Sequence, residues 1–288
     1  MIPAEFQYAT PPTIPEAIAL LQAHQDAKIL SGGQSLIPAL KLRLATPPLL
    51  VDISRIAGLT TLSEAGGWLH IGALVREADL EESPLVRSRY PLLHDTSHVV
   101  ADPLVRNLAT IAGNLAHADP ANDHPATMLA YRAEVVATGP SGARVIAVDS
   151  FFTGLFATAL AHDEILTEVR VPAPMAGSGG AYLKLERKVG DFATAGVAAQ
   201  LNLDAAGRVQ QIGIGLTNVG PMAIRARRSE DVLRGQSPSD ALIAQAAALA
   251  QEDCDPTADL RGSADYKRNM VRILTMRALH KALERARA

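Results

Sequence analysis

The feature that most restricts the fold lies near the N-terminus, where an apolar segment, a glycine-containing loop, a helix and a second apolar segment follow one another. Residues 27–30 are typical of a strand, and the chain then runs through Ser31-Gly32-Gly33-Gln34-Ser35. Residues 36–44 favour a helix despite Pro38, and residues 49–53 favour another strand. This order is that of a βαβ unit, in which the two strands are parallel and the crossover is right-handed.

The middle of the chain has a different pattern, that of antiparallel strands. Residues 59–74 alternate between polar and apolar side chains on either side of a glycine turn, and residues 135–148 repeat this pattern. Such alternation around a tight turn is typical of a β-hairpin. Residues 165–171 predict a further strand, and helical stretches near residues 75–82 and 85–100 lie between the hairpins.

A linker rich in proline, glycine and alanine follows at residues 172–180. Beyond it we predict strands and then helices, at residues 181–187, 193–203, 210–217, 240–252 and 266–287. The whole chain is therefore predicted to be α+β, with a small βαβ domain, a middle domain built on an antiparallel sheet, and a C-terminal domain of a sheet plus helices. The predicted boundaries are 1–55, 56–177 and 178–288.

The predicted last helix is amphipathic and basic. Val271, Leu274, Ala278 and Ala282 share one face, and residues 261–288 hold eight Lys and Arg against two acidic residues. Two interpretations of the basic side chains stay open. They form a solvated helix face, or they form a docking surface for a partner subunit.

The composition excludes several classes of protein. Apolar residues make up 48% and charged residues 20% of 288, as in ordinary globular proteins. The net charge of −3 gives no general attraction to nucleic acid, and the aromatic content of 4% argues against base stacking on single strands. The single cysteine, Cys254, excludes an internal disulfide, and it excludes an iron–sulfur cluster or zinc ribbon held by this chain alone.

No segment is predicted to enter a membrane. The longest apolar stretch, residues 151–161, is shorter than the ~20 residues that a spanning helix needs, and the first residues have no secretory pattern. We therefore expect a cytoplasmic protein with no nucleic-acid partner.

The loop at residues 31–35 has two interpretations. Adjacent glycines let a backbone approach a ligand closely, and a following helix N-terminus offers free N–H groups to a phosphate. A tight turn without a ligand explains the same residues.

A second glycine-containing segment is also predicted to be a loop and offers similar groups. It runs through Thr110-Ile111-Ala112-Gly113-Asn114 and continues to Asp119 and Asp123. We interpret Asp123 either as the N-cap of a helix or as a carboxylate that accepts hydrogen bonds from sugar hydroxyls. A metal site made of Asp119, Asp123 and the nearby histidines is disfavoured, because the proline and the short spacings hinder convergence. The sequence contains no G-x-G-x-x-G fingerprint, no P-loop and no G-x-S-x-G elbow.

Five segments in fixed order carry a resemblance that covers the chain from its first residues to its last helix. They are residues 27–38, 109–120, 182–192, 215–219 and 266–268. Together they are similar to the FAD-binding medium subunit of molybdenum hydroxylases, the xanthine dehydrogenase family, and most of all to its carbon monoxide dehydrogenase type. The resemblance implies that the first two domains hold FAD.

The resemblance also implies a set of binding residues. Residues 31–35 and 110–114 correspond to the pyrophosphate contacts, Asp123 to the ribose-side aspartate, Lys28 and Leu166 to positions near the adenine half, and Phe192 to a position near the isoalloxazine ring. The implied cofactor-binding set is Lys28, Ser31, Gly32, Gly33, Gln34, Ser35, Leu36, Thr110, Ile111, Ala112, Gly113, Asn114, Asp119, Asp123, Leu166, Lys184 and Phe192. No catalytic acid or base and no metal ligand is implied on this chain.

Two residues depart from the carbon monoxide dehydrogenase type. Gln34 stands where that type has histidine, and Ala112 stands where it has glycine. A methyl group at Ala112 is tolerated only if this residue needs neither a positive φ nor the closest approach to the ligand. FAD binding is still implied, whereas carbon monoxide as the substrate is not.

The function implied is electron transfer. A large molybdopterin subunit hydroxylates the substrate, a small subunit carries iron–sulfur clusters, and FAD on this chain passes electrons to an external acceptor. The expected assembly is a heterotrimer, present as a dimer of heterotrimers. Two alternatives are a stand-alone FAD-dependent oxidase of a small organic substrate, and a nucleotide-binding or metal-dependent module without redox chemistry.

Overall fold

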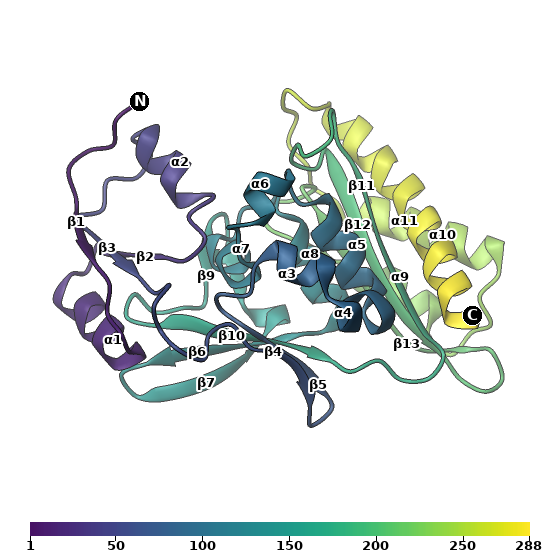
Figure 1. Cartoon of the computed structure of the whole chain (residues 1–288). Coiled ribbons are helices and arrows are strands. Elements are labelled where there is room, and N and C mark those ends of the chain that lie inside the picture. Colours follow the sequence, from purple (N-terminus) through teal and green to yellow (C-terminus); the bar gives the residue numbers. More distant parts are fainter.

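The computed structural model describes residues 1–288 and begins with a small parallel sheet (Figure 1). This N-terminal unit contains β1 (Gln7–Ala9), α1 (Ile14–Ala23), β2 (Lys28–Leu30), α2 (Leu36–Lys41) and β3 (Leu49–Asp52). Strands β2 and β3 are parallel, which confirms the βαβ prediction. Strand β1 pairs in parallel with the other edge of β3 and was not predicted, because three residues give too short a pattern. Helix α2 ends three residues earlier than predicted, shortly before Arg43 takes a φ of +57°.

The middle unit is a five-stranded antiparallel sheet in the order β4-β5-β10-β6-β7. Its strands are β4 (Leu62–Ala65), β5 (Trp68–Gly72), β6 (Glu134–Gly139), β7 (Gly142–Ala147) and β10 (Ile165–Pro172). Both predicted hairpins and the predicted strand at residues 165–171 are confirmed. A short turn η1 (Val148–Ser150) leads into a two-stranded sheet of β8 (Phe152–Gly154) and β9 (Ala157–Thr158).

Six short helices pack beside this sheet. They are α3 (Glu77–Glu82), α4 (Pro84–Arg89), α5 (Pro91–Val99), α6 (Pro103–Arg106), α7 (Ile111–His117) and α8 (Asp123–Tyr131). The helical stretch predicted over residues 85–100 is two helices. Tyr90 leaves the helical conformation between them, because Pro91 lacks an N–H group and restricts the residue before it.

The C-terminal unit is a four-stranded antiparallel sheet in the order β11-β12-β13-β14, with three helices. Its elements are β11 (Ser178–Leu185), β12 (Ala195–Leu203), β13 (Val209–Thr217), β14 (Ile224–Arg225), α9 (Arg227–Leu233), α10 (Asp240–Glu252) and α11 (Ala264–Arg287). Residues 178–180, which were predicted to belong to the linker, are the start of β11. Helix α9 was not predicted.

The units are stacked as layers, with helices between two sheets (Figure 1). Helix α8 packs on β12 and β13, while α10 and α11 lie beyond the C-terminal sheet. A side chain at Gly213 or Gly215 would overlap the α8 carbonyl groups of Ala130 and Ala126. These two glycines therefore let a helix lie close to a sheet and have no part in a nucleotide loop. The division of the chain at residues 55 and 177 stays a prediction.

Helix α11 buries the apolar face that its sequence predicts, with Val271, Ala278 and Ala282 fully covered. Two of its basic side chains have a structural role: Lys281 and Arg285 donate to Asp95 of α5, at 3.0 and 2.7 Å. These side chains therefore tie α11 to the middle unit, a role that neither open interpretation predicted. No helix of the structure, α11 included, combines the length and the apolar character that crossing a membrane requires.

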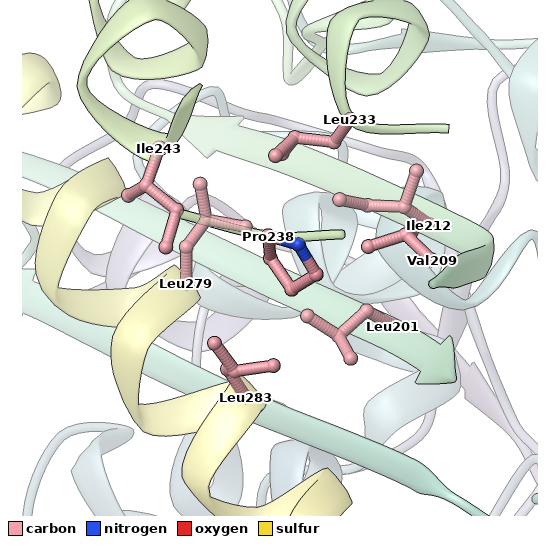
Figure 2. Close-up of a pocket in the computed structure, with 8 residues that line it drawn as sticks. All are labelled: Leu201, Val209, Ile212, Leu233, Pro238, Ile243, Leu279 and Leu283. Atoms are coloured by element: carbon pink, nitrogen blue, oxygen red, sulfur yellow. The ribbon is translucent and has the colours of Figure 1, made fainter. Parts of the chain in front are cut away.

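The core of the C-terminal unit encloses a small void between the sheet and helices α10 and α11 (Figure 2). Leu201, Val209, Ile212, Leu233, Pro238, Ile243, Leu279 and Leu283 line it. Its volume is about 10 Å³, room for one water-sized sphere, and none of its lining side chains carries a polar atom. This void is a packing defect in an apolar core and offers no group that could bind a ligand.

Candidate functional site

The first glycine segment connects β2 to α2 and contains a sharp turn. Gly33 has a φ of +74°, a left-handed conformation that favours glycine. A side chain at Gly32 would overlap the backbone of Leu108, so glycine is needed where a distant segment approaches. Ser35 precedes α2, and Leu36 is the first residue of that helix. The loop is thus a tight turn that also packs against another part of the chain.

The second segment is the start of helix α7, and the prediction of a loop there is wrong. Thr110 is the N-cap, and its Oγ1 accepts the N–H of Gly113 at 3.1 Å. Ile111 and Ala112 are buried in the core, with Ala112 in the helical conformation. The alanine at this position is therefore accommodated without strain. Gly113 and Asn114 are both partly exposed.

The two segments meet side by side. Ser31 Oγ lies 3.0 Å from Thr110 Oγ1 and donates to the carbonyl oxygen of Ala73 at 3.3 Å. The N–H of Glu77 donates to the carbonyl oxygen of Ala109 at 2.9 Å and fixes the second segment from the other side. We call residues 31–35 and 110–114, where the resemblance implies the pyrophosphate contacts, the cofactor groove.

Two features of the cofactor groove fit an elongated anionic ligand such as FAD. A Cβ atom at Gly113 would meet only Thr110 Oγ1, at 2.9 Å, so this position is otherwise open. Asn114 Oδ1 is buried and has no hydrogen-bond partner in the protein. Since buried polar atoms are normally paired, this amide is available to a ligand hydroxyl or, turned over, to a phosphate oxygen. The N-terminus of α7 adds a partial positive charge.

The chain after α7 turns back and starts α8. Asp119 Oδ1 accepts the N–H of Ala121 at 2.9 Å, and Asn122 is the N-cap of α8. The side chain of Asn122 donates to the carbonyl oxygen of Asn114 at 2.9 Å, which holds this turn against the cofactor groove. Asp123 is the first residue of the helix, so the interpretation of Asp123 as an N-cap is wrong.

Asp123 lies instead in a buried cluster with two side chains of strand β11. Tyr182 Oη donates to Asp123 Oδ1 at 2.6 Å, and Lys184 Nζ donates to Oδ2 at 3.1 Å. The side chains of Asp123 and Lys184 are 7% and 3% exposed. Burial and the adjacent carboxylate hold the pKa of Tyr182 well above its ordinary value, so its hydroxyl keeps the proton that it donates. The cluster joins the C-terminal sheet to α8.

Lys184 also contacts the segment that leads to Phe192. Its Nζ donates to the carbonyl oxygens of Asp191 and Val99, at 3.0 and 2.7 Å. The carboxylate of Asp191 accepts the N–H of Phe192 at 2.8 Å, and Phe192 itself is 48% exposed. A chain of polar contacts therefore runs from Asp123 through Lys184 to the residue next to an exposed aromatic ring.

Three predicted residues lie apart from these contacts. Lys28 is exposed on β2, and the side chain of Gln34 turns back to the carbonyl oxygen of Gly32 at 3.4 Å. Leu166 is 5% exposed and packs in the core beneath the middle sheet. Their contacts with a cofactor stay predictions.

Two residues outside the predicted set contact this cluster and its neighbouring segment. Tyr182 stands two positions before Lys184 in a strand, and the period of two places both side chains on one face, so the pattern could have found it. Arg261 donates to Asp191 at 2.9 Å from 70 positions away, and no sequence pattern marks that contact.

Comparison with known proteins identifies the family. Residues 4–174 match the family model "FAD binding domain in molybdopterin dehydrogenase", and residues 180–282 match "CO dehydrogenase flavoprotein C-terminal domain". The carbon monoxide dehydrogenase medium chain of Hydrogenophaga pseudoflava is 45% identical over 99% of both chains. The 6-hydroxypseudooxynicotine dehydrogenase complex subunit alpha of Paenarthrobacter nicotinovorans is 37% identical over 100% of this chain and 97% of its own length.

A solved structure of a related protein also matches this chain along almost its whole length. Carbon monoxide dehydrogenase from Hydrogenophaga pseudoflava, in a form that lacks the Mo-pyranopterin moiety of the molybdenum cofactor, contains a chain that matches with a TM-score of 0.96 at 47% identity. The match covers 99% of each chain. With both family models matched along almost its whole length, this chain belongs to the family of FAD-binding medium subunits of molybdenum hydroxylases.

Proposed function

We propose that this chain transfers electrons within a heterotrimeric molybdenum hydroxylase. A large subunit would hold the molybdenum–pterin centre, a small subunit would hold the iron–sulfur clusters, and an external acceptor would take the electrons that leave this chain. The observation that carries the proposal is the contact between Ser31 and Thr110, because it brings the two glycine segments together, and the turn before Asp123 is bonded to Asn114 of the second segment. We further propose that two such heterotrimers associate.

The residues of this chain would bind and orient FAD. The cofactor supplies the redox chemistry through its ring system when it is bound. The backbone N–H groups of residues 31–35 and the N-terminal end of α7 would hold the pyrophosphate, and Asp123 would accept a sugar hydroxyl. Each carboxylate oxygen of Asp123 uses one lone pair for Tyr182 or Lys184, so a second lone pair is available to the ligand.

The cysteine of this chain supports a division of labour among subunits. Iron–sulfur clusters need several thiolates, and Cys254 is the single cysteine in the sequence. Its thiol is buried and donates to the carbonyl oxygen of Ala250 at 3.1 Å, and burial raises its pKa to about 12. The clusters therefore belong to another chain.

Purification of the intact complex through a tag on this chain tests the proposal. We expect flavin, iron and molybdenum to co-purify with two further subunits, and we expect substrate to bleach the flavin absorbance under anaerobic conditions. Removal of the small subunit should abolish the bleaching by substrate and leave reduction by dithionite intact. Turnover of an organic substrate by the chain alone, free of iron and molybdenum, would contradict the proposal and favour a stand-alone oxidase.

A further inference from the structure

Arg261 lies in the loop before α11 and reaches the segment that carries Phe192. Its Nη2 donates to Asp191 Oδ1 at 2.9 Å, and Arg187 Nε donates to Oδ2 of the same carboxylate at 2.9 Å. The guanidinium carbon of Arg261 lies 5.8 Å from the centre of the Phe192 ring, within the range of a cation–π contact. One side chain thus contacts both the carboxylate and the aromatic ring of this segment.

The loop that carries Arg261 is itself anchored. Asp259 Oδ1 accepts the N–H groups of Arg261 and Gly262, at 2.7 and 3.2 Å. Asp259 Oδ2 accepts from Lys267 Nζ at 2.8 Å, and the Lys267 side chain is only 2% exposed. The guanidinium is therefore presented from a fixed backbone, which lowers the entropy lost when it holds Asp191.

The ion pair persists at any working pH. The hydrogen bond from Arg261 is the main cause that lowers the pKa of Asp191 to about 2. The Asp191 side chain is 8% exposed and that of Arg261 is 23% exposed, so the pair is partly shielded from water. A charge held in such surroundings acts on its neighbours more strongly than a fully solvated one.

We propose that Arg261 is a positioning residue for the ring end of FAD. This inference rests on the function proposed above and on the position of Phe192 near that ring, which the resemblance implies. Through Asp191 it fixes the backbone at Phe192, next to the carbonyl group that Lys184 holds. Its positive charge behind the Phe192 ring favours the reduced cofactor, which carries more negative charge than the oxidised one. Arg261 thereby raises both the affinity for FAD and its reduction potential.

The test compares Arg261→Gln and Arg261→Lys in the purified complex. Arg228→Gln serves as the control. This substitution also removes an ion pair, the one with Asp253 at 2.7 Å, but Arg228 lies in α9 and has no contact with Asp191 or Phe192. We expect Arg261→Gln to raise the FAD dissociation constant by about five-fold or more and to make the flavin midpoint potential more negative. Arg261→Lys should recover most of the potential, and Arg228→Gln should change neither quantity.

Unchanged FAD affinity and potential in Arg261→Gln would overturn the inference, as would equal shifts in Arg228→Gln. If Arg261→Gln does not assemble, Asp191→Asn tests the same ion pair from its other side, and wild-type FAD affinity in that variant would also overturn it. A wild-type complex without FAD would contradict the proposed function itself. A wild-type complex with FAD and an unaffected Arg261→Gln variant would contradict only the role of Arg261.

Discussion

The two ends of the proposed FAD site are built in different ways. At the phosphate end, glycines, hydroxyl groups and backbone N–H groups surround an open groove, and each contributing run is five residues long. From the sugar to the ring end, Asp123, Lys184, Asp191 and Arg261 form ion pairs that are mostly shielded from water. A phosphate needs room and N–H donors, whereas a ring system needs charges placed around it by distant parts of the chain. The same kind of substitution should therefore have different consequences at the two ends.

The largest effect is expected at the phosphate end. Gly113→Val would place two methyl groups in the open part of the cofactor groove, where a Cβ meets only Thr110 Oγ1. We expect FAD affinity in the complex to fall by about 100-fold or more, equal to about 2.7 kcal/mol, with the fold retained. Ala116→Val is the control, because it places the same two methyl groups on an exposed position of the same helix, outside the glycine segment, and has the less favourable change in helix propensity of the two substitutions. Full flavin occupancy in Gly113→Val would remove this segment from the phosphate site.

A smaller loss of FAD, together with a loss of stability, is expected for Asp123→Ala. The substitution removes an acceptor from the ligand and takes away the nearer of the two carboxylates beside the buried Lys184 ammonium, leaving Glu186 at 3.3 Å. We expect at least about ten-fold weaker FAD binding, since a charged hydrogen bond contributes roughly 1.5–3 kcal/mol. Titration with FAD and thermal unfolding measure the two effects separately.

Tyr182→Phe is the control for Asp123→Ala. It removes the hydrogen bond to Asp123 Oδ1 but keeps the ion pair with Lys184. Tyr182→Phe should therefore lower stability by about 1 kcal/mol and change FAD affinity little. Equal FAD affinity in Asp123→Ala and wild type would assign Asp123 a purely structural role.

The two ends also differ in how well the sequence predicts them, because the phosphate end is built from local segments and the ring end from distant ones. The βαβ unit and both hairpins follow from local patterns, and so do the two glycine segments, because each lies within one short stretch of sequence. The start of α7 was misread as a loop because Thr110 and Gly113 are equally typical of an N-cap and of a turn. The pairing of Arg261 with Asp191 depends on how α11 packs against β11, which no local pattern encodes.

A third prediction separates the ring end from the core. Phe192 is 48% exposed, so removal of its ring costs little buried area, but the ring lies 5.8 Å from the guanidinium carbon of Arg261. We expect Phe192→Ala to shift the flavin spectrum or its potential and to change the unfolding temperature only slightly. A clear drop in unfolding temperature with an unaltered flavin spectrum would make Phe192 a packing residue.

The smallest effect is expected in the core of the C-terminal unit, which supports the ring end but contacts no ligand. The void there is about 10 Å³ and lies among apolar side chains, Val209 among them (Figure 2). Val209→Ile adds one methyl group toward this space, and because a buried CH₂ is worth about 0.8 kcal/mol, we expect stability to rise by less than about 1 kcal/mol. FAD affinity and potential should equal those of wild type, since Val209 is the first residue of β13, whereas Thr217, which hydrogen-bonds to Tyr182 of the Asp123 cluster, is the last. Denaturant unfolding and FAD titration of the same complex measure both quantities. A changed potential would mean that packing of this sheet affects the ring end directly. The core of the C-terminal unit could then no longer be treated as a support without influence on the flavin.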